Sequence, residues 1–152
     1  MQIQQLLRTD PERILLLVKN VDGSGSITTG FGAALVATAA SGDGVNAFRS
    51  SKTAGATSHF CGVALQDIAI NAYGLVTAWG YAASVAISQS VGSTTITAGD
   101  VLIAATPAGT FTSVVTNAAL SIAMYKYVIA TGALADTISN PNPYIAGIVR
   151  MV

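Results

Sequence analysis

The chain has 152 residues, of which 51% are hydrophobic and only 9% are charged, and its formal net charge is zero. This length suits one domain with a substantial buried core. With no basic run and no acidic tail, the composition argues against nucleic acid as a partner. The longest purely apolar run, Ile14–Val18, is far shorter than the roughly 20 residues that a membrane-spanning helix needs, so no membrane partner is expected.

The low content of charged residues predicts large protein–protein contacts. Soluble domains typically carry about 25% charged residues, so a chain with so few is expected to bury much of its surface in large protein–protein contacts. The alternative is a protein that stays soluble through its Ser and Thr residues.

The N-terminal segment divides into a polar stretch and an apolar run. Thr9-Asp10-Pro11-Glu12 fits a helix capping box, but the following run is short and ends at the Gly/Ser turn 22–26. A strand from Arg13 to Asn20 is therefore favoured over a helix. We expect an extended arm over residues 1–13 and a single β-rich domain over residues 14–152. The polar start lacks the apolar core of a secretory signal, which indicates assembly in a cytoplasm.

Residues 60–80 predict two strands joined by a polar turn, because apolar side chains alternate in both halves. Asn71 and Gly74 suit the turn and its flanks because both tolerate positive φ. The residues expected to share a face are Cys61, Val63 and Leu65 on the first strand, and Tyr73, Leu75, Thr77 and Trp79 on the second.

Shorter strand signals fill the rest of the chain. They fall within residues 27–38, 81–88, 101–104, 110–115 and 144–152, whereas residues 39–58 resemble a loop. Residues 118–129 fit either a helix or a strand, and their β-forming residues favour a strand. Short strands separated by glycine turns predict an all-β fold, either a small β-sandwich or a β-barrel.

No set of residues predicts catalysis, cofactor binding or a metal site. His59 and Cys61 face one side of a strand, but a metal needs more ligands and a thiol nucleophile needs an aligned base, so both are expected to be structural. Asp22–Ser26 lacks the alternating oxygen ligands of a calcium loop and is expected to be a turn. We therefore expect a protein that is not an enzyme and has no cofactor.

Aromatic residues give two further hypotheses. Tyr73, Trp79 and Tyr81 suit a platform for sugars, although packing in the core and at strand edges is favoured. Three other tyrosines could lie at a protein interface, where tyrosine is enriched, rather than simply pack within the fold. These are Tyr125, Tyr127 and Tyr144.

Four stretches of the chain resemble the decoration, or cement, proteins that bind the outside of tailed-bacteriophage capsids. They are Asp10–Val21 with the turn and Thr29-Gly30 after it, Phe60–Ala64 leading to Asn71–Gly80, Ile96–Leu102, and Ala146–Met151. The resemblance covers most of the chain and is one of pattern rather than of a diagnostic motif.

The resemblance implies a β-rich virion protein without catalytic residues. Such a protein binds the major capsid protein on the capsid surface, often as a homotrimer, and stabilises contacts between capsid subunits. Some members of the family bind as monomers or dimers, so the resemblance does not fix the oligomeric state. The competing hypotheses are a carbohydrate- or receptor-binding module of a phage tail or other surface structure, and a hydrolase that uses His59 and Cys61.

Overall fold

The computed structural model describes residues 12–36, 46–50, 59–88, 95–105, 108–113, 126–134 and 143–151. Within these ranges the chain forms strands and no helix, which confirms the predicted all-β class. The strands are β1 (Ile14–Asn20), β2 (Gly32–Leu35), β3 (Asn46–Arg49), β4 (Phe60–Ala64), β5 (Tyr73–Ala86), β6 (Val101–Ala104), β7 (Phe111–Ser113), β8 (Lys126–Ala130) and β9 (Tyr144–Met151).

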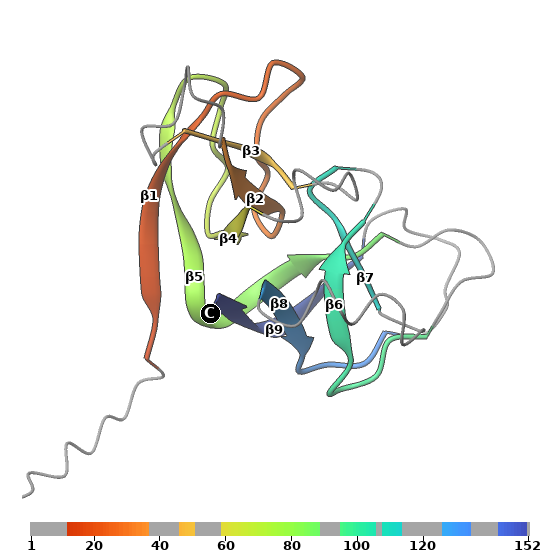
Figure 1. Ribbon diagram of the computed structural model, residues 1–152. Coiled ribbons are helices and arrows are strands. Elements are labelled where there is room, and N and C mark those ends of the chain that lie inside the picture. Colours follow the sequence, from red (N-terminus) through yellow and green to blue (C-terminus); the bar gives the residue numbers. More distant parts are fainter. Residues whose placement is uncertain are drawn as a thin grey trace, which may run out of the picture.

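Five strands close into a small barrel, which we call the first barrel. Its strands follow the order β1-β3-β2-β4-β5, and β5 then pairs with β1 to complete the ring. Four of these pairings are antiparallel, and only β1 and β3 run parallel. Closure leaves each of these strands with a hydrogen-bonded neighbour on both sides. Figure 1 shows this barrel as the upper part of the molecule.

β5 belongs to two sets of strands. Its first half pairs with β1 and β4, whereas Gly80–Ala86 pairs with β9 and begins a second sheet of order β5-β9-β8-β6-β7. The chain turns between the two halves near Gly80, where φ is +99° (Figure 1). A Cβ atom at this position would overlap the carbonyl oxygen of Glu12, so both the backbone angle and the close approach require glycine.

The second sheet curls back toward its starting strand. β7 meets the end of β5 through a parallel bridge between Ile87 and Phe111. The N–H of Ser88 donates to the carbonyl of Phe111 at 2.7 Å. The second sheet is therefore nearly closed, but by a single bridge rather than by a strand ladder.

Each set of strands encloses its own core. The first barrel buries small side chains and a few branched ones: Val18, Ile27, Ala33, Ala47, Cys61, Ala64, Ile68 and Val76. The second core is larger and includes Phe60, Val63, Val85, Ile87, Ile96, Leu102, Phe111, Val128, Ile145 and Val149. Phe60 and Phe111 meet edge to face, with ring centroids 5.6 Å apart.

β4 lies between the two cores, and this corrects the predicted face of the strand. Cys61 belongs to the first core and Val63 to the second, so these side chains do not share a side. The pairing of β4 with β2 shifts register between Ala33 and Ala34, which changes the alternation. Every residue of β4 is buried because its two sides pack against different cores.

A seam of glycines joins the two units away from β5. The N–H of Gly32 donates to the carbonyl of Gly109 at 2.7 Å, and the N–H of Gly109 donates to the carbonyl of Ser50. A Cβ atom at Gly109 would overlap the ring of Phe31, and one at Gly32 would overlap Ser50 and Phe111. The β6–β7 turn therefore packs directly on the first barrel.

Most predicted strands are confirmed, with two corrections. The stretch 39–58 is not only a loop, since it contains β3, and the strands expected before and after Gly80 are one continuous strand. Asn71 has the expected positive φ, 63°. β9 lies within the predicted strand 144–152, and its buried residues alternate: Ile145, Gly147 and Val149. Apart from Glu12 and Arg13, the predicted arm lies outside the described residues, as do residues 114–125.

Candidate interaction surface

The outward side of β5 carries aromatic and aliphatic residues along most of its length. Tyr73, Leu75, Thr77 and Trp79 share one side of β5, as predicted, and Tyr81 follows after Gly80. This side is more exposed than the other at Tyr73, Leu75, Trp79 and Tyr81, but Thr77 in its middle is buried. Tyr73 is 59% exposed and Trp79 is half-buried, whereas Gly74, Val76 and Ala78 on the other side are buried.

β1 widens this surface with further apolar residues. Leu17 lies opposite Leu75 and Leu15 lies opposite Thr77, and residues paired in this way project from the same side of a sheet. The register then shifts, so that Ile14 lies opposite Trp79. Ile14, Leu15 and Leu17 are 53%, 41% and 58% exposed. We call the surface formed by Ile14, Leu15, Leu17, Tyr73, Leu75, Trp79 and Tyr81 the β5 face.

Three cationic side chains lie over the three rings of the β5 face. The Lys19 Nζ is 5.9 Å from the centroid of Tyr73. The guanidinium of Arg150 is 5.2 Å from the centroid of Trp79, and that of Arg13 is 5.6 Å from the centroid of Tyr81. Each pair fits a cation–π contact, which fixes a flexible basic side chain beside an apolar surface.

This arrangement bears on the sugar-platform hypothesis. All three predicted aromatic residues do lie on one side of β5, but a cation already lies over one face of each ring. A sugar stacking on those faces would have to displace the cation. Tyrosine, tryptophan and arginine together are instead typical of protein–protein contact surfaces.

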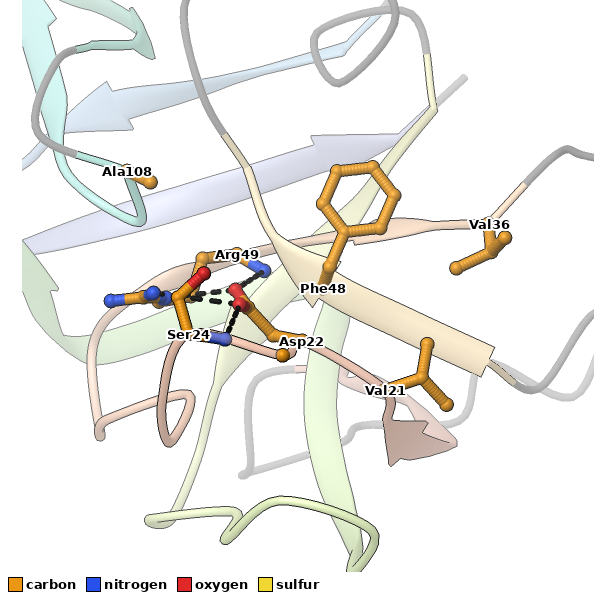
Figure 2. A pocket seen from close by; sticks show the side chains of 8 residues that line it. Val21, Asp22, Ser24, Val36, Phe48, Arg49 and Ala108 are labelled. Atoms are coloured by element: carbon orange, nitrogen blue, oxygen red, sulfur yellow. Dashed lines mark hydrogen bonds and ion pairs between the residues drawn. The ribbon is translucent and has the colours of Figure 1, made fainter.

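A second candidate is an open hollow of about 550 Å³ beside the first barrel, lined by Val21, Asp22, Gly23, Ser24, Val36, Phe48, Arg49 and Ala108. Figure 2 shows that its two charged side chains point at each other. Nε of Arg49 donates to the Asp22 carboxylate at 2.9 Å, and the N–H of Ser24 donates to it at 2.8 Å. Since the Arg49 side chain and Asp22 satisfy each other, we assign this pair to holding the turn after β1 against β3.

The ion pair between Asp22 and Arg49, which we call the clamp between β1 and β3, lowers the pKa of Asp22. Partial burial alone would raise the pKa, but hydrogen bonds from the Arg49 side chain and from the N–H groups of Ser24 and Arg49 outweigh it. They lower the pKa of Asp22 from 3.8 to about 2. Asp22 therefore acts as a structural anion in the turn predicted for residues 22–26, and within the described ranges no cluster of acids, His and Cys suits a metal.

Of the other predicted pair, His59 and Cys61, the cysteine is placed for packing. Cys61 is fully buried, and its thiol donates to the carbonyl of Ala33 at 3.4 Å. A buried thiol in apolar surroundings is a poor nucleophile because a substrate in solvent cannot reach it. The geometry therefore gives the hydrolase hypothesis no support.

Of the three predicted interface tyrosines, Tyr144 is the one whose side chain the structure describes. Tyr144 is exposed on β9, where its ring packs against Gly30. The side chains of Tyr125 and Tyr127 lie outside the described residues. In the described part of the chain, no helix is long and apolar enough to cross a membrane.

Sequence reasoning missed the exposure of β1 and the cations above the rings. The sequence did indicate the exposure of β1, because Ile14–Val18 is apolar at every position. A strand with one buried side needs apolar residues only at alternate positions. The cation–π pairs join residues far apart in sequence and left no local signal. Comparison of the chain with protein families, with curated proteins and with solved structures found no match.

Proposed function

We propose that this protein is a structural component of a tailed-phage virion that binds the outer surface of the capsid and stabilises contacts between major capsid protein subunits. The observation that carries the proposal is the amount of exposed apolar surface on a chain with 9% charged residues. Nine large apolar or tyrosine side chains are exposed among the described residues. Ile14, Leu15 and Leu17 cluster on β1, and clustered apolar exposure of this kind favours an interaction site.

The fold supports the same role. The two units share β5 and a glycine seam, and seven of the nine exposed residues lie on strands, whereas Leu65 and Ile70 lie in the loop between β4 and β5. A support built mainly of strands suits a protein that braces its neighbours. Many copies bound to one shell, themselves grouped as homotrimers, would add weak contacts into high avidity. The proposed partners are therefore the major capsid protein and the protein itself, and the proposed location is the virion surface after assembly in the host cytoplasm.

The test is the stoichiometry of this protein in gradient-purified virions, measured by quantitative mass spectrometry against the major capsid protein. We expect hundreds of copies in a simple ratio to the capsid protein. A handful of copies would favour a tail or vertex location, and absence from virions would reject the proposal.

The binding-module alternative has one observation in its favour, the presence of three aromatic residues on one side of β5. It is tested by the fluorescence of Trp79, the only tryptophan. A shift on adding host surface glycans would support it, and an unchanged spectrum would reject it.

A further inference from the structure

The β5 face combines two properties that define a partner. The first is apolar exposure that is clustered on β1, where the exposed Ile14, Leu15 and Leu17 pair with Trp79, Thr77 and Leu75 of β5. In a folded chain, a cluster of this kind is usually covered by another protein, because leaving it in water forgoes hydrophobic stabilisation.

The second property is positive charge. Arg13, Lys19 and Arg150, three of the chain's seven Lys and Arg residues, lie over the rings of this face. Glu12 also lies near this face, because its backbone carbonyl approaches Gly80 of β5, whereas the other described acids are engaged elsewhere. Asp22 binds Arg49, Asp67 accepts from Thr29, and Asp100 accepts from Thr97. A chain of zero net charge thus presents a locally basic strip.

We infer that the β5 face docks onto an acidic, apolar surface of another protein, which, if the proposed function holds, is the outer surface of the major capsid protein. Apolar residues at the centre would exclude water, and Arg13 and Lys19 would meet carboxylates of the partner. The inference names the part of this protein that makes the capsid contact, and so it depends on the proposed function for the identity of the partner.

The cation–π contacts favour this role physically. Free lysine and arginine side chains lose rotamer freedom when a partner fixes them, which weakens binding. Here the rings of Tyr73, Tyr81 and Trp79 already restrict Lys19, Arg13 and Arg150. Aromatic and arginine residues are also the types that dominate binding energy in measured interfaces.

Charge argues against a second copy of the chain as the occupant. In a two-fold contact the same patch meets itself, so Arg13 and Lys19 of one copy would face the same cations of the other. Like charges brought together in this way oppose binding. A two-fold self-contact through the β5 face is therefore disfavoured.

The apolar part is tested with Leu17→Asp, because Leu17 is 58% exposed and the change adds a charge to the apolar cluster on β1. The matched control is Ile70→Asp, since Ile70 is 47% exposed but lies in the loop before β5. Binding is measured by co-sedimentation with purified shells assembled from the major capsid protein of the same phage. We expect Leu17→Asp to weaken binding at least tenfold and Ile70→Asp to change it less than threefold.

The charge is tested with the double variant Arg13→Gln, Lys19→Gln, which removes two cations without altering buried residues. Thr131→Glu is the control, because it adds a negative charge at an exposed site after β8. The double variant should bind the shells at least fivefold more weakly at low salt, and raising NaCl should reduce the difference from the native protein. Circular dichroism and thermal unfolding check that every variant is folded.

The outcomes separate this inference from the proposed function. If the native protein binds shells and both β5-face variants bind equally well, the inference is wrong while the proposed function stands. If the native protein binds no shells and is absent from virions, the proposed function fails. If light scattering shows that Leu17→Asp dissociates an oligomer of the free protein, the β5 face is a self-contact and the inference is overturned.

Discussion

The first barrel and the second sheet share β5 but reach stability in different ways. The first barrel is closed by strand pairing all the way round and buries mainly small residues. The second sheet is closed by one bridge and buries larger residues, including the Phe60–Phe111 pair. The comparison indicates that backbone hydrogen bonds define the first unit, whereas side-chain packing holds the second together.

The largest effect is expected for Phe111→Ala, which tests whether side-chain packing holds the second core together. Phe111 is fully buried, meets Phe60 and lies against Gly32 of the first barrel. Its removal should lower the free energy of unfolding by about 3–5 kcal/mol, because a large aromatic side chain leaves a cavity. Chemical denaturation measures the loss. Phe48→Ala, at a half-buried position, is the control and should cost clearly less; equal losses would contradict the importance of packing in the second core.

The joint between the two units is tested by Gly80→Ala. Gly80 and Gly99 have nearly the same φ, 99° and 98°, but only at Gly80 would a Cβ atom meet neighbouring backbone. Gly99→Ala should therefore cost about 1–2 kcal/mol from the backbone angle alone. Gly80→Ala should cost about 1–3 kcal/mol more, because Glu12 or β5 must move. Unfolding free energies of both variants give the difference, and equal losses would show that the joint is not tightly packed.

The clamp between β1 and β3 predicts a dependence on pH. The pKa of Asp22 is lowered to about 2 in the folded protein from an ordinary value of 3.8. The ionised Asp22 therefore adds its full contribution to the free energy of unfolding above about pH 4, and this contribution is lost as the pH falls toward 2. Because the pair is partly exposed and solvent screens it, we expect this contribution to the free energy of unfolding to be about 1 kcal/mol.

The measurement is the unfolding free energy of native protein and Asp22→Asn between pH 5 and pH 2. The variant should lose less stability across this window. Some dependence should remain, because hydrogen bonds from the N–H and hydroxyl of Thr29 also lower the pKa of Asp67. Identical pH profiles would contradict the role of the clamp.

The smallest expected effect concerns the middle of β5, where Thr77 lies between Leu15 and Val63. Its hydroxyl is buried and has no hydrogen-bond partner among the described residues. Thr77→Val should raise the unfolding free energy by about 1 kcal/mol, because an unpaired buried polar group is removed at nearly constant shape. Thr97→Val is the control, since Thr97 donates to Asp100 at 3.0 Å and its loss should be slightly destabilising. Destabilisation by Thr77→Val would indicate a partner for that hydroxyl.

The amino-acid sequence by itself determined the all-β class and the places of most strands. Alternation and glycine turns are local signals, so β1, β4, β6 and β9 were predicted close to their observed bounds. The alternation in β9 shows which residues share a side, but that Ile145, Gly147 and Val149 form the buried side is known only from the structure. β3 was missed because its four residues carry too little pattern to stand out from the polar stretch around them.

Only the tertiary structure decided which sides of the strands face a core. Alternation shows which residues share a side of a strand but not whether that side is covered. The alternation of β5 was therefore predicted from the sequence, whereas its exposed side is known only from the fold. The continuity of β5 through Gly80 depends on the backbone of Glu12 packing there, and the burial of β4 on both sides depends on the presence of two cores. The cations over Tyr73, Trp79 and Tyr81 come from strands distant in sequence, and their meeting is a product of strand register rather than of any local pattern.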